Sequence, residues 1–179
     1  MYSTVVNDID KSGWEAGPWS DEPDHIVWSD ASTQYLCVIR RNHFGALCGY
    51  VAVHEGHPWH GKDYDDIQAD VHGGLTYSDS QASVREANHG PGVTESLTGI
   101  TVPDSLWWVG FDCGHGFDIS PRLEAVYAST GFKSVRFAYG AEYRTVAYIR
   151  EECTWLAWQA HEAVVGPKIT EMFEGDDDE

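Results

Sequence analysis

Two apolar segments stand next to each other in the first third of the chain and give its clearest pattern. Residues 35–41 read YLCVIRR and residues 47–53 read LCGYVAV, with the short link NHFGA between them. Both segments are rich in β-branched and aromatic residues, and a short link that contains glycine is typical of a β-hairpin. The sequence therefore predicts two paired antiparallel strands here.

Two later segments alternate between apolar and polar positions, as half-buried strands do. In residues 67–77, IQADVHGGLTY, the apolar row is Ile67, Ala69 and Val71. In residues 106–116, LWWVGFDCGHG, the apolar row is Trp107, Val109 and Phe111. If these strands are neighbours, successive side chains point to opposite faces, and the other face collects Asp70, His72, Trp108 and Asp112. Residues 134–140, SVRFAYG, are a further candidate strand.

A helical period dominates the C-terminal part of the chain. Between Ala141 and Val164 apolar residues recur every three or four positions, at Val146, Ile149, Cys153, Leu156, Ala160 and Val164. This spacing predicts one long amphipathic helix that lies across the sheet. We expect Trp155 and Trp158 on this helix to belong to the core.

These elements predict an α+β fold with an antiparallel sheet of about four to six strands. The C-terminal helix packs on one face, and loops 54–66 and 78–105 cover the other. Residues 1–25 mix Gly, Pro, Asp and Trp without a period and are predicted to be an irregular arm whose Trp14 and Trp19 pack on the domain. Residues 26–165 then form a single α+β domain, and residues 166–179 form an acidic, disordered tail.

The charge of the chain restricts its partners. It has 11 Lys and Arg against 29 Asp and Glu, a formal net charge of −18. Such a chain lacks the cations that neutralise phosphates, so we expect neither nucleic-acid binding nor attraction to anionic membranes. No apolar run is long enough to span a bilayer and no signal peptide is recognisable at the start, which predicts a cytoplasmic protein. The sequence leaves self-association as a homo-oligomer open.

Four cysteines, Cys37, Cys48, Cys113 and Cys153, form no CxxC pair, and we expect reduced thiols. Cys37 and Cys48 could face each other across the hairpin, but a cytosolic setting argues against a disulfide. Cys113 beside His115 also has the residue types of a nucleophilic dyad, although adjacent strand residues point apart.

Two clusters could hold a metal ion. The first is formed by His72, Asp112, Cys113 and His115, because imidazole, carboxylate and thiolate bind Zn²⁺ or a related divalent ion, which can activate water. The second lies in HEGHPWHGKDYDD and contains His54, His57, His60, Asp63, Asp65 and Asp66. Gly56, Pro58 and Gly61 exclude a regular helix there, so that loop would itself have to fold around the ion or serve as a lid. The alternative without a cofactor is that these histidines only make hydrogen bonds.

The many aromatic residues suggest a third kind of site. The chain has 8 Trp and 9 Tyr, and some of them lie beside the polar strand face and could stack on a planar ring. The expected ligand-binding residues are Asp70, His72, Trp108, Asp112, His115, Tyr77, Trp59, Lys62 and Arg85. We expect His72 to be held by a carboxylate, Asp70 or Asp112, and Gly73 and Gly74 to let a ligand or loop approach the backbone.

Several short motifs together resemble a group of small uncharacterised proteins of tailed phages and their bacterial hosts. These motifs are LCGYVAV, GHPWHGKDYDD, DVHGGLTYSD, WWVGFDCGHG and YRTVAYIREECTWLA, and the resemblance covers roughly residues 35 to 160. It implies a role in manipulating the host cell, such as blocking an immune system. Small folded proteins that sequester nucleotide signals are one class of phage counter-defence protein.

The sequence therefore suggests three alternative functions. The first is binding of a small planar, nucleotide-like ligand in a loop-covered pocket without turnover, which would sequester a host immune signal. The second is a metal-dependent hydrolase that uses the Asp/His cluster. The third is an acidic host-protein binder or nucleic-acid mimic, which rests on the net charge alone.

Overall fold

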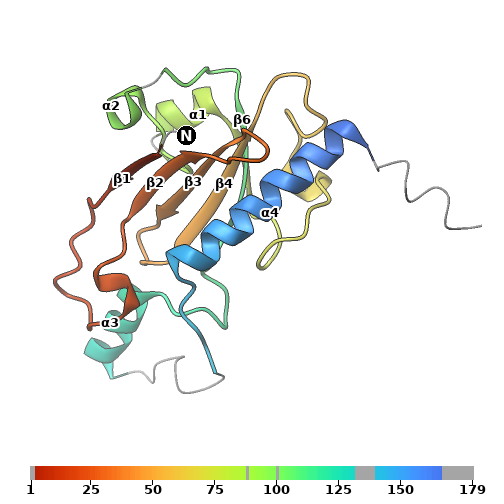
Figure 1. The fold of residues 1–179 in the computed structure, drawn as a ribbon. Helices are drawn as coiled ribbons and strands as arrows, with labels where there is room; N and C mark the ends of the chain where they lie inside the picture. The colour runs from red at the N-terminus through yellow and green to blue at the C-terminus, as the bar shows by residue number, and fades with distance from the viewer. Residues whose placement is uncertain (1–2, 88, 100, 132–139, 167–179) are drawn as a thin grey trace, which may run out of the picture.

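The fold is an antiparallel sheet of six strands with helices on both sides (Figure 1). The structure, a computed structural model, describes residues 3–87, 89–99, 101–131 and 140–166. The strands are β1 (Ser3–Val6), β2 (His25–Ser29), β3 (Leu36–Arg41), β4 (Leu47–Val53), β5 (Tyr77–Ser80) and β6 (Trp107–Asp112). The helices are α1 (Gln81–Ala87), α2 (Glu95–Thr98), α3 (Pro121–Thr130) and α4 (Val146–Val165), with short 3-10 turns η1 (Pro18–Ser20) and η2 (Tyr64–Asp66).

The predicted hairpin is confirmed as β3 and β4, which lie in the middle of the sheet order β1-β2-β3-β4-β6-β5. Gly49 on β4 pairs with Ile39 on β3 and with Phe111 on β6. A Cβ atom at Gly49 would lie 2.5 Å from the Phe111 ring and 2.7 Å from the sulfur of Cys153 on α4. The missing side chain thus leaves room for the Phe111 ring and for α4 above β4.

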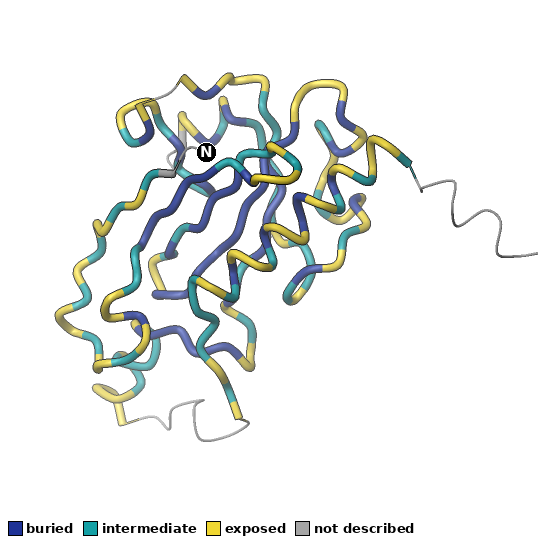
Figure 2. Tube along the Cα trace, viewed as in Figure 1, coloured by how far each residue is buried: buried dark blue, intermediate teal, exposed yellow. Residues whose placement is uncertain are grey.

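Both faces of the sheet are covered, and strand alternation divides the core into two clusters. The central strands of the sheet are buried over most of their length (Figure 2). On one face, Val51 and Val109 pack with Leu156 of α4. On the other face, Tyr50 and Trp108 pack with the segment between β5 and β6. The predicted position of segment 78–105 is correct, since Val84, Val93 and Val102 belong to the second cluster. The segment is not a loop, however, because it contains most of β5 and the helices α1 and α2. The prediction for loop 54–66 is wrong, because this loop packs Trp59 into the cluster on the α4 face.

The predicted strand over residues 67–77 is wrong in all but its last residue. Residues 67–76 form no strand, and pairing with β6 begins only at Tyr77. Ile67 and Val71 are buried as the alternation indicates, but they pack as loop residues in the cluster below α4. Gly73 and Gly74 have φ angles of +70° and +85°, which a regular strand does not contain. The candidate strand 134–140 lies outside the described residues, except for Gly140.

The N-terminal arm is less irregular than its sequence indicates. Ser3–Val6 pairs with β2 as an edge strand of the sheet, and β2 begins at His25, inside the predicted arm. Trp19 is buried, as expected, and its ring meets the ring of Tyr143 edge-on at 5.1 Å. Trp14 lies 6.0 Å from the guanidinium of Arg41.

The long helix is confirmed, although it begins at Val146 and not at Ala141. The Thr145 side chain caps it by accepting a hydrogen bond from the Tyr148 N–H, which satisfies one of the free donors of the first turn. Trp155 and Trp158 are 44% and 42% exposed, so the prediction that they belong to the core is wrong. They flank Leu156 and Ala157, which face the sheet, and so they lie on the outer side of α4. Residues 167–179 of the expected tail are outside the described residues.

Arg41 joins three distant parts of the chain beside the sheet. Its side chain is fully buried and donates to Asp24 Oδ1 at 2.9 Å, to the Gly45 carbonyl at 3.0 Å and to the Tyr143 hydroxyl at 2.7 Å. Asp24 also accepts from Lys11 Nζ at 2.8 Å. The N-terminal arm, the β3–β4 hairpin and the entry to α4 are thereby held by one guanidinium.

All four cysteines are free and buried. Cys37 belongs to the core cluster on the α4 face and Cys48 to the cluster on the opposite face, so they do not face each other across the hairpin. In the described part of the chain, no helix has both the length and the apolar character of a membrane span.

Candidate metal centre

Three side chains with metal-binding atoms meet at the end of β6, on the α4 side of the sheet. They are His72, His115 and Asp118, and one ligand atom of each lies within 4.8 Å of the other two. His72 Nε2 lies 2.8 Å and His115 Nδ1 lies 3.3 Å from Asp118 Oδ2. No other group of this kind is found in the part of the chain that the structure describes.

The backbone between β6 and α3 positions two of these residues. After Asp112 the chain turns, and the His115 N–H donates to Asp118 Oδ2 at 3.2 Å, so both side chains project from the same short turn. His72 comes from the loop before β5. The next residue, Gly73, has a positive φ, and a Cβ atom there would lie 2.2 Å from the His115 ring. A glycine at this position is therefore what allows the two histidine rings to lie 5.5 Å apart.

Residues at the start of α4 and just before it surround the three side chains. The Tyr148 hydroxyl lies 3.1 Å from His72 Nδ1, and a carboxylate oxygen of Glu152 accepts from the His72 N–H at 2.7 Å. Tyr148 and Glu152 are four residues apart and so share one face of the helix. Arg144 donates from Nε to Asp118 Oδ1 at 2.9 Å.

The electrostatics keep Asp118 ionised. Burial of the carboxyl would raise its pKa, but hydrogen bonds from His72 and Arg144 outweigh burial and hold the pKa of Asp118 below its ordinary value. The same ion pair raises the pKa of Arg144. Asp118 is therefore a carboxylate with one oxygen held by Arg144 and the other oxygen turned toward the two imidazoles.

The spacing of the three ligand atoms suits a small divalent ion. Atoms bound about 2.0 to 2.2 Å from a tetrahedral ion lie roughly 3.3 to 3.6 Å from one another. The separations of 2.8 and 3.3 Å to Asp118 Oδ2 need only a small outward movement of the rings. Three protein ligands leave one position for water, which is the arrangement of catalytic zinc sites. If Nε2 of His72 binds an ion, its Nδ1–H can donate to Tyr148, as the second nitrogen of a ligand histidine usually donates to a partner.

Of the residues predicted to form a site, the structure brings together His72 and His115. A carboxylate does hold His72, but it is Asp118 and neither Asp70 nor Asp112. Asp70 bonds through its backbone to Gln159 on α4. Asp112 accepts from the Thr76 hydroxyl at 2.9 Å and from the Gly114 N–H at 2.8 Å, so it caps a turn.

Cys113 does not join the cluster of ligand atoms. It is 2% exposed and packs in the core below α4. Burial, together with the charge of Asp118, raises the pKa of its thiol. A thiol that stays protonated is a poor nucleophile, so the structure gives no support to a Cys113 and His115 dyad.

The remaining predicted ligand residues are spread over both faces. Trp108 is fully buried on the opposite face, where its indole N–H donates to Gln81 at 2.7 Å, and Tyr77 packs there against Tyr50. Trp59 is a core residue on the α4 face. The exposed Lys62 and Arg85 are set apart from the cluster: the Lys62 carbonyl accepts from Trp107, and Arg85 pairs with Asp104 at 2.7 Å. The expected polar pocket around Trp108 is therefore absent among the described residues.

The histidine-rich loop is a packing element. His57 is buried, with Nε2 2.9 Å from the Ala160 carbonyl and Nδ1 accepting from the Trp59 N–H at 3.0 Å. His60 lies 2.8 Å from the Ser105 carbonyl, and His54 is exposed. These contacts fasten the loop to α4 and to the segment before β6. Asp65 and Asp66 lie in the 3-10 turn η2, and the Asp63 side chain caps it by accepting from the Asp65 N–H at 3.1 Å.

Sequence reasoning missed Asp118, Arg144, Tyr148 and Glu152. A signal for Asp118 was present, since it follows His115 by three residues in FDCGHGFD and the glycines indicate a tight turn. Arg144, Tyr148 and Glu152 are spaced four apart, but nothing in that spacing identifies His72 and Asp118 as their partners.

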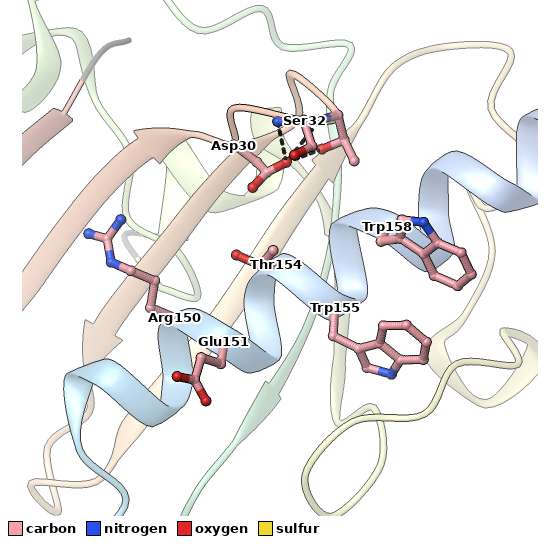
Figure 3. A pocket seen from close by; sticks show the side chains of 8 residues that line it. Asp30, Ser32, Arg150, Glu151, Thr154, Trp155 and Trp158 are labelled. Atoms are coloured by element: carbon pink, nitrogen blue, oxygen red, sulfur yellow. Dashed lines mark hydrogen bonds between the residues drawn. The ribbon is translucent and has the colours of Figure 1, made fainter.

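A second feature is an open groove of about 540 Å³ between α4 and the turn after β2 (Figure 3). Its wall on the helix is formed by Trp155 and Trp158, whose rings stack in parallel at 4.8 Å. The opposite wall is the turn at Asp30, which accepts hydrogen bonds from Ser32 and Thr33. Arg150, Glu151 and Thr154 complete the lining.

Comparison with known proteins gives no relative from which a role can be taken. No family model, no curated protein and no solved structure matches this chain. The site is therefore interpreted from its own geometry.

Proposed function

We propose that the protein is a metal-dependent hydrolase whose ion, of the Zn²⁺ type, is bound by His72, His115 and Asp118. The observation that carries the proposal is the convergence of these three ligand atoms within 4.8 Å. Two imidazoles and one carboxylate are a preferred donor set for Zn²⁺, and an open fourth position holds the water that the ion activates.

The surroundings of the three residues support the proposal. Tyr148 faces the second nitrogen of His72, and Arg144 holds the second oxygen of Asp118. Such outer partners fix the orientation of ligands and are a usual part of metal sites. His115 has a side chain that is 35% exposed, so a substrate can reach this side of the cluster from solvent.

The first test is titration of tag-free, chelator-treated protein with Zn²⁺ by calorimetry. We expect one ion per chain and a loss of affinity of at least about 100-fold in His115→Gln, because even an outer partner of a ligand contributes about 10- to 100-fold. Tyr148→Phe should weaken binding by about tenfold. His54→Gln, a change of an exposed histidine in the loop, is the matched control and should bind as the unchanged protein does.

Turnover is measured in the same samples with three nitrophenyl substrates, a phosphomonoester, a phosphodiester and an acetate ester. We expect Zn²⁺-dependent release of nitrophenol from at least one of them, lost in His115→Gln and kept in His54→Gln. Absence of saturable binding, or equal losses in both variants, would refute the metal site. Tight binding with no turnover of any substrate would refute the hydrolase and leave a metal-binding protein.

A second candidate is binding of a planar, nucleotide-like ligand without turnover, the function that the resemblance to phage proteins implies. The groove at Trp155 and Trp158 favours it, since exposed stacked indoles offer a flat apolar surface for a ring. The lining contains one arginine, Arg150, and two carboxylates, Asp30 and Glu151. This balance favours a ligand with few phosphates over a polyphosphate.

The groove is tested by tryptophan fluorescence with AMP, cyclic AMP and ADP-ribose, followed by heat release and mass analysis of the recovered ligand. We expect saturable quenching that Trp158→Ala weakens by about tenfold, the order of one base-stacking contact, with the ligand recovered intact. Trp107→Phe, on the sheet, is the control and should leave affinity unchanged. Equal affinity in Trp158→Ala, or no saturable change with any of the three compounds, would count against the candidate.

A further inference from the structure

A polar pocket of about 310 Å³ lies on the sheet face opposite α4, where β3 ends and β4 begins. Its lining combines the hairpin with the segment that follows α1, and consists of Arg40, Arg41, Asn42, His43, Cys48, Tyr50, His89 and Gly90. These described residues include two arginines and two histidines and no carboxylate. In a chain with 29 acidic and 11 basic residues, a lining with arginines and no carboxylate is not what the composition predicts.

Arg40 supplies the free positive charge of the pocket. Its guanidinium makes one hydrogen bond to the described part of the chain, from Nη1 to the Gly90 carbonyl at 3.0 Å. A guanidinium carries five N–H donors, so most of them remain for a ligand. Arg41, by contrast, is committed to Asp24, Gly45 and Tyr143 on the other face.

The backbone holds the Arg40 guanidinium in place. Gly92 has a φ of +60°, and a Cβ atom at this position would lie 2.3 Å from Arg40 Nη1. The segment 90–92 therefore packs directly on the guanidinium and fixes its plane. A fixed guanidinium loses less freedom when it binds a carboxylate or phosphate through two parallel hydrogen bonds.

Two acidic side chains near the pocket, Asp79 and Asp112, already accept hydrogen bonds from the protein. Asp79 accepts from the Ser83 hydroxyl at 2.7 Å and lies 3.1 Å from His89 Nε2. Asp112, which pairs across the sheet with Cys48, accepts from Thr76 and Gly114. His89 Nδ1 is buried without a hydrogen-bond partner among the described residues, and in the imidazolium form it is a further donor.

We propose that this pocket binds a small organic anion, with its phosphate or carboxylate group on Arg40. The volume is at the lower end of the range for small-molecule sites, which suits a compact metabolite and not a dinucleotide. The pocket is separated from the His72 cluster by the sheet, so this proposal does not depend on metal binding or hydrolysis.

The test is calorimetric titration in a low-salt buffer that contains a chelator, so that no bound metal can hold the anion. The probes are inorganic phosphate, glycerol 3-phosphate and succinate. We expect saturable binding of at least one probe, and the tighter of glycerol 3-phosphate and succinate identifies phosphate or carboxylate as the preferred group. Arg40→Gln should weaken that binding at least tenfold, and Arg40→Lys should weaken it less.

Arg85→Gln is the matched control. Arg85 lies on α1, on the same side of the sheet as Arg40, but it is exposed and paired with Asp104. It should bind as the unchanged protein does. Melting curves of all variants show whether the fold is kept, and His89→Gln, with an expected weakening, replaces Arg40→Gln if that variant does not fold. The proposal is overturned if no probe gives saturable heat, or if Arg85→Gln weakens binding as much as the pocket variants.

Discussion

Replacement of Arg41 by leucine is expected to lower the free energy of unfolding by about 3 to 5 kcal/mol, the usual cost of leaving a buried charge without its partner. The Arg41 and Asp24 side chains are 0% and 1% exposed. Without the guanidinium, the Asp24 carboxylate keeps one cation, Lys11, while the Gly45 carbonyl and the Tyr143 hydroxyl lose a donor. The substitution therefore removes the hydrogen bonds that link the N-terminal arm, the hairpin and the entry to α4.

Urea unfolding followed by circular dichroism measures this effect. Arg122→Leu is the control, since Arg122 is an exposed arginine with one hydrogen bond to the His43 carbonyl, and it should change stability by about 0.5 kcal/mol or less. A loss in Arg41→Leu no greater than in the control would show that the buried pair does not hold these segments together.

Replacement of Leu156 by alanine is expected to destabilise the protein by about 2 to 5 kcal/mol, because a fully buried leucine of α4 leaves a cavity above the sheet. The neighbouring Trp155→Ala removes a larger side chain but from a position that is 44% exposed, and should cost about 1 kcal/mol or less. Thermal and urea unfolding of the two variants measure the difference. If Trp155→Ala costs as much as Leu156→Ala, then the outward orientation of Trp155 is wrong.

The parts of the fold that the sequence predicted are those with continuous apolar patterns. β6 and α4 each bury a regular row of side chains whose spacing can be read from the sequence. β3 and β4 are apolar segments that are buried over most of their length, and a short link joins them. Residues 67–76 show the limit of this reasoning. Ile67 and Val71 are four residues apart and both buried, as in a strand with one buried face. The backbone between them nevertheless pairs with no strand, because a side chain can be buried without its backbone joining a sheet.

The tryptophans of α4 mislead for a related reason. Large aromatic residues usually enter cores, but a helix turns about 100° per residue, and the positions flanking Leu156 and Ala157 fall outside its buried stripe. The pattern of small and apolar residues at Cys153, Leu156, Ala157 and Ala160 was the better guide to the buried face.

The candidate site was predictable only in part, because it joins segments that are far apart in the chain. His72 and His115 were identified from their neighbours in DVHGG and DCGHG, but their common partner depends on how the turn after β6 folds. Asp118 meets His72 across 46 residues and Arg144 across 26 residues. Side-chain types indicate which atoms can bind a metal, whereas only the fold decides which of these atoms lie close enough together to bind the same ion.

The order of the strands has a consequence for the nascent chain as it leaves the ribosome. β1 to β4 follow one another in space as they do in sequence, so this meander can pair as soon as Val53 is synthesised. The edge of this meander at β4 stays unpaired until β6, which begins at Trp107, has been synthesised. One apolar face stays uncovered until α4, which ends at Val165, is complete. During synthesis the half-made sheet therefore presents an unpaired edge and an open apolar face, the features that chaperones bind and that favour aggregation.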